Sequence, residues 1–183
     1  MEYKLKDLVN ISSSKRIYYS EYQNEGIPFY RGKEIIEKSE NNSVSTELFI
    51  SENRYNELKE KYGVPQKGDI LITAVGTLGK SWLVDDSKFY FKDGNCLWFS
   101  NFSDKINNKY LFYYLKTKDF KDIIDNISIG STQKALTIQQ LKEVKIILPN
   151  INIQNKIVKI LDKIYSKLYI NTKTNDNLLY KVA

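Results

Sequence analysis

Two short segments of the chain combine glycine, hydroxyl and lysine residues, the groups that bind phosphate most readily. The first is Gly76-Thr77-Leu78-Gly79-Lys80, which fits the relaxed phosphate-loop consensus when Ala74 replaces its first glycine. A nucleotide-binding loop opens a helix whose N–H groups hold the phosphate. Because Trp82-Leu83-Val84 predicts a strand instead, we expect a loop between two strands, whose glycines let the backbone approach a ligand closely. With Thr77 and Lys80 as contacts, such a loop suits a DNA phosphate better than a nucleoside triphosphate.

The second segment runs from Gly130 to Lys134 and precedes a predicted helix. The hydroxyls of Ser131 and Thr132 and the ammonium of Lys134 suit phosphate, and the amide of Gln133 suits a bidentate contact with adenine. An ordinary polar surface turn explains the same composition equally well. We therefore treat these residues as candidate DNA contacts.

A third group of candidates mixes cations and aromatic rings near the N-terminus: Lys15, Arg16, Tyr18, Arg31 and Lys33. Arginine is the side chain best suited to bidentate contact with guanine, so Arg31 joins Gln133 as a predicted base-edge contact. Arg54, on a predicted helix, is expected to be solvated. Interleaved charges and rings also occur on plain protein surfaces, so this group is a weaker signal than the loops.

The composition excludes several common kinds of catalytic site. The chain has no histidine and only one cysteine, Cys96, which excludes Ser-His-Asp and Cys-His catalysis, histidine-ligated metal and an internal disulfide. No string of the Asn-Pro-Pro-Tyr or Asp-Pro-Pro-Tyr type, typical of DNA methyltransferases, is present. We expect a protein without catalytic activity, cofactor or metal.

Charge and hydrophobicity indicate a folded, basic domain. The chain has 183 residues, a formal net charge of +6 and 42% hydrophobic residues, enough for one domain with a real core. No apolar run approaches the roughly 20 residues that span a bilayer, and the first residues show no signal-peptide pattern. The expected compartment is the cytoplasm.

Hydrophobic periodicity divides the chain at Leu148-Pro149-Asn150. Before this point, we predict an α+β body with a mixed sheet. Its expected strands are Pro28 to Arg31, Asp69 to Ala74, Ser81 to Val84, Lys88 to Phe91, Cys96 to Ser100 and Val144 to Leu148. Its expected helices are Ser51 to Tyr62, Asn108 to Thr117 and Ile138 to Val144, the last with a capping box formed by Thr137 and Gln140.

After this point, the pattern predicts one long amphipathic helix, with Asn152 able to cap its start. At about 1.5 Å per residue, some 30 residues reach roughly 45 Å, which is longer than the body needs for its own core. The apolar stripe of this helix is expected to meet another surface, in a second copy or a partner, although a helix folded back on its own body remains an alternative. The stripe comprises Ile157, Ile160, Leu161, Ile164 and Leu168.

Four longer strings occur in order along the chain: Gly26 to Ile35, Gly68 to Lys80, Phe91 to Asn95 and Gly130 to Thr137, followed by Leu148-Pro149 and the helix containing Gln154. Together they resemble one target recognition domain of the DNA-specificity subunits of type I restriction-modification systems. The family usually has Glu-Gln near the start of this helix, whereas this chain has Ile153-Gln154. The resemblance covers nearly the whole chain.

The resemblance implies a subunit without catalysis of its own. Residues 1–150 would read a short half-site in double-stranded DNA, and residues 151–183 would form a spacer helix that docks on methyltransferase subunits, with the restriction subunit recruited through the complex. A complete specificity subunit carries two recognition domains and two spacer helices, so the resemblance implies a half subunit that restores this geometry by homodimerisation. Such a dimer would read an inverted, interrupted repeat. The alternative from another class is a protein-interaction scaffold whose body binds no DNA.

Overall fold

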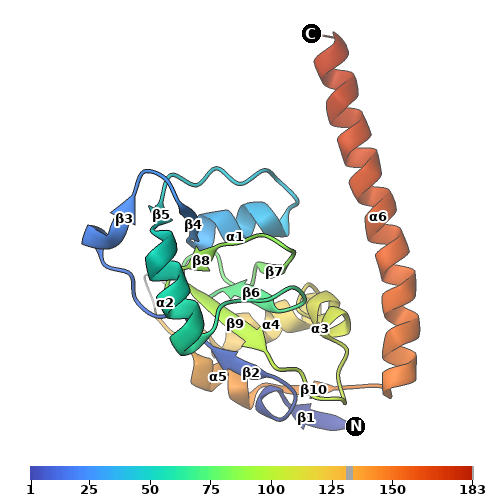
Figure 1. The fold of residues 1–183 in the computed structure, drawn as a ribbon. Helices are drawn as coiled ribbons and strands as arrows, with labels where there is room; N and C mark the ends of the chain where they lie inside the picture. Colours follow the sequence, from blue (N-terminus) through green and yellow to red (C-terminus); the bar gives the residue numbers. More distant parts are fainter. Residues whose placement is uncertain (131–133, 183) are drawn as a thin grey trace.

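The computed structural model describes residues 1–130 and 134–182; in the last helix it describes the side chains up to residue 172 and that of residue 174. The body has two four-stranded sheets and a two-stranded one, and a single helix rises away from it (Figure 1). The fold is α+β, as predicted.

The first sheet has the strand order β2-β9-β6-β7 and is antiparallel throughout. Its central strand β6 has four buried residues, since side chains cover both of its faces. Helices α3, α4 and α5 contribute Leu111, Phe120 and Leu141 to the core on one face. The bounds are β2 Asn10–Ser12, β6 Ile70–Thr73, β7 Ser81–Leu83, β9 Cys96–Ser100, α3 Asn108–Tyr114, α4 Lys118–Ile127 and α5 Ile138–Glu143.

The second sheet has the order β3-β5-β4-β8, and its β4–β8 pair is parallel while the others are antiparallel. The mixed sheet expected from the sequence is therefore present. Helix α2 packs Tyr55 and Leu58 on this sheet, and Tyr30, Leu71 and Trp82 belong to a shared core between the two sheets. The bounds are β3 Tyr22–Gln23, β4 Ile27–Tyr30, α1 Gly32–Ser39, β5 Phe49–Ile50, α2 Glu52–Tyr62 and β8 Tyr90–Phe91.

Strand β1 (Glu2–Lys4) pairs with β10 (Lys145–Ile147) and joins the two ends of the body. Glu143 at the end of α5 accepts hydrogen bonds from Lys4 and Lys6, at 2.6 and 2.7 Å. These contacts hold the pKa of Glu143 down to about 2, chiefly through the Lys4 hydrogen bond. Short 3-10 helices cover Leu5–Asp7 and Tyr19–Glu21.

The strands and helices predicted from the sequence are all found, with bounds that differ by up to three residues. The capping box of Thr137 and Gln140 is confirmed, as is the helix predicted from Ser51 to Tyr62, which is α2 with Ser51 as its N-cap. Several elements were missed: β1, β2, β3, β5, α1 and α4. The predicted cap of the last helix was wrong, because Asn150 and not Asn152 accepts a hydrogen bond from the Ile153 N–H, at 3.0 Å.

The last helix, α6, extends over Ile151–Val182, and its first turns are fixed to the body. The amide of Gln154 is fully buried; it accepts a hydrogen bond from the Asn107 N–H and donates to the carbonyls of Lys105 and Pro149, each at 2.9 Å. Two turns later, Asp162 accepts hydrogen bonds from Lys109 and Tyr113 of the α3 segment. The helix is thus neither free along its whole length nor folded back on the body.

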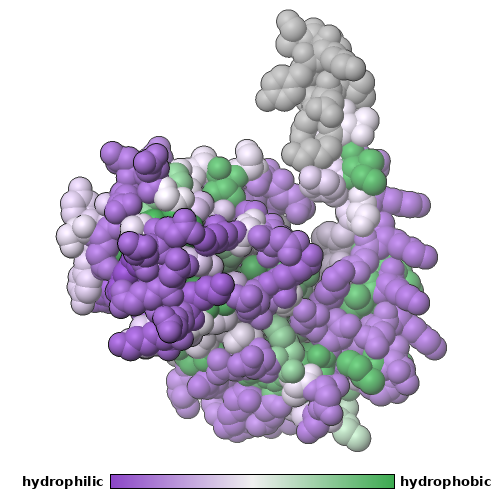
Figure 2. Space-filling model, in the orientation of Figure 1, coloured by the Kyte–Doolittle hydropathy of each residue, from purple (hydrophilic) through white to green (hydrophobic). Residues whose placement is uncertain are grey.

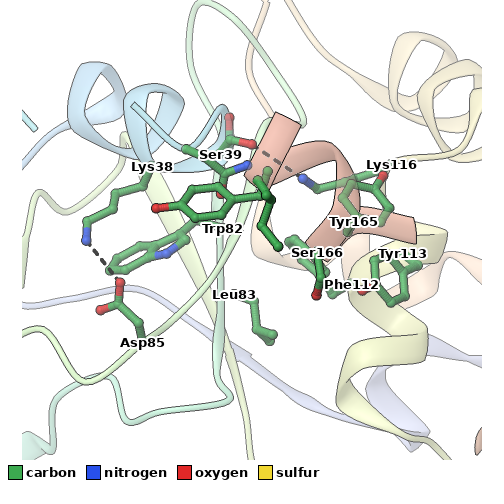
Figure 3. A pocket seen from close by; sticks show the side chains of 13 residues that line it. Lys38, Ser39, Trp82, Leu83, Asp85, Phe112, Tyr113, Lys116, Tyr165 and Ser166 are labelled. Carbon is green, nitrogen blue, oxygen red and sulfur yellow. Dashed lines mark hydrogen bonds and ion pairs between the residues drawn. The ribbon is translucent and has the colours of Figure 1, made fainter. Parts of the chain in front are cut away.

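Beyond these contacts, a cleft of about 550 Å³ separates α6 from α1, β7 and α3. Aromatic rings line it: Trp82 from the body, Tyr165 from α6, and Tyr113, whose ring lies 5.0 Å from that of Tyr165 (Figure 3). Lys38 closes one side through its ion pair with Asp85, at 3.0 Å.

The body surface in Figure 2 is mostly hydrophilic, whereas apolar residues interrupt the polar surface along α6. Of the stripe predicted for association, Ile160, Ile164 and Leu168 are exposed, while Ile157 and Leu161 are partly covered. In the part of the chain that the structure describes, no helix is long and apolar enough to cross a membrane.

Candidate nucleic-acid interface

The candidate residues emerge from strand ends that meet at one edge of the fold. Parallel pairing places the carboxyl ends of β4 and β8 together, and antiparallel pairing places the end of β6 beside the start of β9. Hydrogen bonds then connect the segments that leave these strands: Ser14 donates to the Phe91 carbonyl, the Lys92 N–H to Tyr30, and the Ala74 N–H to Asn95. We call this surface the loop edge; it comprises residues 13–18, 31–33, 74–80, 92–95, 130 and 134–136.

The segment from Gly76 to Lys80 is a loop between the antiparallel neighbours β6 and β7, as predicted. The Thr73 hydroxyl donates to the Thr77 carbonyl at 2.5 Å and accepts from the Lys80 N–H at 3.0 Å, which fixes the loop from inside. Gly76 and Gly79 have φ of +77° and +78°, a region that favours glycine. Because strand β7 follows directly, the loop lacks the helix that a nucleotide-binding loop needs.

The second glycine segment lies against the first. Ala135 forms bridges with both Val75 and Ile129, and the Leu136 N–H donates to the Ala74 carbonyl at 2.8 Å. Lys134 is exposed and lies 3.9 Å from Asp125. Ser131, Thr132 and Gln133 lie outside the described residues, so their predicted contacts with DNA stay predictions.

The N-terminal candidates are present at the same edge. Arg16, with a side chain 68% exposed, pairs with Asp93 at 3.0 Å, and Lys15 places its ammonium 4.8 Å from the centre of the Tyr62 ring. Tyr18 is 63% exposed. Cations and an exposed ring therefore occur together here, and the cations can neutralise the phosphates of a nucleic acid.

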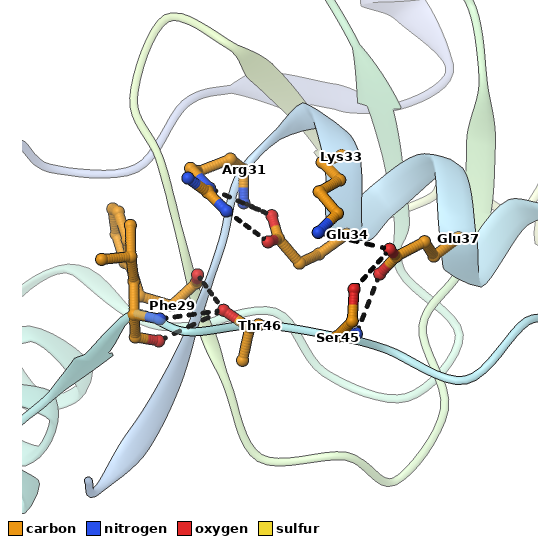
Figure 4. A network of polar contacts seen from close by, with 8 residues as sticks. Phe29, Arg31, Lys33, Glu34, Glu37, Ser45 and Thr46 are labelled. Carbon is orange, nitrogen blue, oxygen red and sulfur yellow. Dashed lines mark hydrogen bonds and ion pairs between the residues drawn. The ribbon is translucent and has the colours of Figure 1, made fainter. Parts of the chain in front are cut away.

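Arg31 is held differently from the other cations (Figure 4). Its Nη2 lies 2.8 Å from Oε1 of Glu34, and its backbone N–H donates to Oε2 at 2.7 Å. The Glu34 side chain is 0% exposed. Burial alone would raise the pKa of Glu34, but the hydrogen bonds from Arg31 outweigh it and hold the pKa below its usual range. The guanidinium predicted to read a base is thus already engaged with a buried carboxylate.

The other candidate lysines have weaker partners. Lys33 lies 3.8 Å from Glu37, and Lys80 lies 2.9 Å from Glu40, with both partners of the Lys80 pair more than 40% exposed. Exposed ion pairs contribute about 0 to 1 kcal/mol. An incoming phosphate can therefore replace Glu40 beside Lys80 at little cost.

One expectation about the arginines was wrong. Arg54 is not a freely solvated side chain, because it pairs with Glu21 and Glu57 at 2.8 Å each and is only 28% exposed. Sequence reasoning also missed Lys116, Lys118 and Lys121, which share a cleft with Lys80 and Lys134. The signal for two of them was available. The apolar residues after Thr117 have helical spacing (Phe120, Ile123, Ile124 and Ile127), which places Lys118 and Lys121 at the start of a helix.

The described residues of this region offer neither a reactive thiol nor a cluster of metal ligands. Cys96 is buried, which raises the pKa of its thiol to about 12 and leaves it unreactive. Among the described residues, no group of three or more acidic, cysteine or histidine side chains is placed to hold a metal ion.

A basic loop edge on an α+β body with a protruding helix fits the class of DNA-recognition domains that carry a helical spacer. The family model described as the type I restriction modification DNA specificity domain matches residues 1–180. The chain belongs to this family.

Individual relatives of the chain are specificity subunits of the same family. The chain is 35% identical over 161 residues to a putative type I restriction enzyme specificity subunit, S.HindORF215P, of Haemophilus influenzae, with 87% of this chain and 39% of the relative covered. It is 26% identical to the MjaVIII specificity subunit of Methanocaldococcus jannaschii, over 96% of this chain and 41% of the relative.

Solved structures share the fold. The HsdS subunit from Thermoanaerobacter tengcongensis superposes with a TM-score of 0.67 at 20% identity, over 95% of this chain and 39% of that one. The S subunit from M. genitalium gives a TM-score of 0.62 at 18% identity, over 92% and 40%. The chain therefore spans about two fifths of the length of the relatives that it matches.

Proposed function

We propose that this chain is the DNA-reading half of a type I specificity subunit: its loop edge binds a short half-site in duplex DNA, and α6 connects it to methyltransferase subunits. Membership of the specificity family supports this function directly. The observation that carries it in the structure is the convergence of the cationic loops at one edge, because a duplex needs phosphate contacts and base contacts on one continuous surface.

Within this proposal, Lys15, Arg16, Lys33, Lys80 and Lys134 neutralise phosphates, Thr77 and the glycine backbones approach the DNA closely, and Tyr18 packs on the duplex. Gln133 is the proposed reader of adenine. A base contact from Arg31 requires its guanidinium to leave Glu34, so we assign Arg31 first to holding α1 in place.

The exposed side of α6 is the proposed contact with a second copy or with a methyltransferase subunit. Gln154, Val158 and Asp162 face the body, whereas Ile160, Ile164 and Leu168 are left 60%, 47% and 55% exposed. An apolar row of this kind is typical of helices that associate. The proposed homodimer would present two loop edges to an inverted, interrupted site, and the restriction subunit would join through the complex.

Duplex binding over a salt series tests the DNA-reading proposal. Fluorescence anisotropy of a labelled duplex should give an association constant that falls steeply with log salt, and Lys80→Gln or Lys134→Gln should flatten the slope by about 0.9 for each phosphate that the chain no longer neutralises. The matched control is Lys145→Gln, on β10, where the lysine is 59% exposed and paired with Glu2. A chain with no salt-dependent affinity for duplexes would be a protein scaffold instead.

A further inference from the structure

A cleft of about 700 Å³ opens beside the loop edge, between the β6–β7 loop and the α3–α4 junction. Among the described residues that line it are the lysines missed by sequence reasoning, together with Lys80 and Lys134, against a single carboxylate, Asp125. We propose that this cleft holds the phosphodiester backbone of the bound duplex, with Lys116 and Lys121 as its principal new contacts. The proposal rests on the DNA-reading function and extends it to residues that no loop of the predicted interface contains.

Packing fixes the two walls of the cleft relative to each other. A Cβ atom on Gly79 would lie 2.7 Å from Cδ1 of Ile124, so the glycine lets the β6–β7 loop rest directly on α4. Ile124 is in turn buried in the main core. Lys80 from the loop and Lys121 from α4 therefore face one space whose width is set by buried contacts.

Lys116 lies where this cleft adjoins the aromatic cleft along α6, because its side chain lines both. Its side chain is exposed, but nearby atoms displace part of its water: the ammonium lies 4.4 Å from the centre of the Phe112 ring and donates to the Ser39 carbonyl at 3.4 Å. This desolvation, followed by repulsion from Lys80, lowers the pKa of Lys116. An anion placed between Lys80 and Lys116 would relieve the repulsion.

The backbone of α4 adds donors on the same side. Its N-cap, Thr117, uses its hydroxyl for the Phe120 N–H, while Lys118 and Lys121 add positive charge to a helix start that is already positive. Asp119 lies between them in the first turn, so these three side chains leave a net charge of +1 at the start of α4, which favours an anion there.

The occupant follows from continuity with the loop edge. A phosphate on a free nucleotide and a phosphate in a DNA backbone offer the same charge, but Thr77, Lys80 and Lys134 belong to both the cleft and the loop edge. A duplex lying on the loop edge therefore brings its backbone to the cleft without any rearrangement of the chain. This continuity favours DNA over a separate nucleotide.

The test compares Lys116→Gln and Lys121→Gln with the control Lys145→Gln, using a labelled random-sequence duplex at about 0.1 M salt. Removing one phosphate contact should weaken binding roughly eightfold and flatten the salt slope by about 0.9, because about 0.9 counterion is released per contact. The control should change affinity by less than about twofold. If the unchanged chain binds DNA but the two cleft variants match the control, the cleft proposal fails while the proposed function stands.

Two further experiments test whether Lys116 acts through its charge or through packing, and whether the cleft binds DNA or a free nucleotide. Lys116→Arg should bind like the unchanged chain, whereas Lys116→Met should bind like Lys116→Gln, with both variants folded by circular dichroism. Failure of Lys116→Arg to keep the affinity would mean that the lysine acts through packing on Phe112. Millimolar ATP should not bind saturably; saturable ATP binding that Lys116→Gln abolishes would make the cleft a nucleotide site and overturn the proposal.

Discussion

Replacing Arg31 by alanine should destabilise the fold before it alters base recognition. The change removes the guanidinium that holds the fully buried carboxylate of Glu34, while the backbone N–H of residue 31 still donates to it. Breaking a buried pair costs about 3 to 5 kcal/mol. The Arg31 side chain is 35% exposed, so screening reduces this figure, and we expect a decrease in stability of about 1 to 3 kcal/mol.

Urea and thermal unfolding of Arg31→Ala, Glu34→Gln and the double variant measure this pair. A decrease of about 1 to 3 kcal/mol corresponds to a thermal midpoint lower by roughly 2 to 12 °C for a chain of this size. Glu34→Gln should cost less in the Arg31→Ala background than alone, with a coupling of at least about 0.5 kcal/mol. The control is Arg16→Ala, whose exposed pair with Asp93 should contribute under about 1 kcal/mol.

The pH dependence gives a second measurement of the same pair. The pKa of Glu34 is lower in the folded chain than its ordinary value of 4.5, so the pair stabilises the fold above that pH, and the contribution disappears as the pH falls through the folded pKa. Arg31→Ala should therefore lose less stability than the unchanged chain on acidification below about pH 4.5. Equal stability of Arg31→Ala and the unchanged chain at neutral pH, with loss of cognate binding alone, would refute this reasoning and return Arg31 to base reading.

Three other perturbations test the packing of the loop edge and of α6. Gln154→Leu should leave the partly buried Asn107 N–H without its acceptor and cost about 1 to 3 kcal/mol in urea unfolding, and an unchanged midpoint would contradict the anchoring role of Gln154. Gly79→Ala should lower the stability of the fold by about 1 to 2 kcal/mol, because residue 79 has a positive φ, and it should also displace the Ile124 side chain on α4. Calorimetry measures this decrease. Unchanged stability would mean that the loop can move away from α4. Ile160→Asp with Ile164→Asp should give a monomer in sedimentation at micromolar concentration; the proposal for α6 fails if the unchanged chain is itself monomeric and shows no binding to methyltransferase subunits.

Local signals in the sequence were sufficient to predict much of the secondary structure of the body. Thr137 and Gln140 have the spacing of a capping box, and the β6–β7 loop could be separated from a nucleotide-binding loop because a strand pattern follows it. Strands of two or three residues, such as β3 and β5, carry too few side chains to show a period, so they were missed. Their pairing is set by tertiary contacts.

For the candidate site, too, the sequence predicted the residue types but not how they pack. Its residue types were evident from composition, but the sequence could not show that Glu34 lies buried beneath Arg31, since burial depends on how α1 packs on both sheets. Nor could it show that α3, α4 and the β6–β7 loop meet in one lysine-lined cleft. For α6, the period predicted an apolar stripe, but only packing against α3 determines that Gln154 and Asp162 face inward while Ile160 and Ile164 stay exposed.

Selection of duplexes from a random-sequence pool by the purified chain tests the central claim, that the loop edge reads a specific DNA sequence. Sequencing of the retained duplexes should show enrichment of one short half-site, present as an inverted, interrupted repeat where the chain dimerises through α6. A variant with Lys80 and Lys134 both changed to Gln should retain far less DNA of every sequence. Retention of all sequences equally, or of none, would contradict the claim.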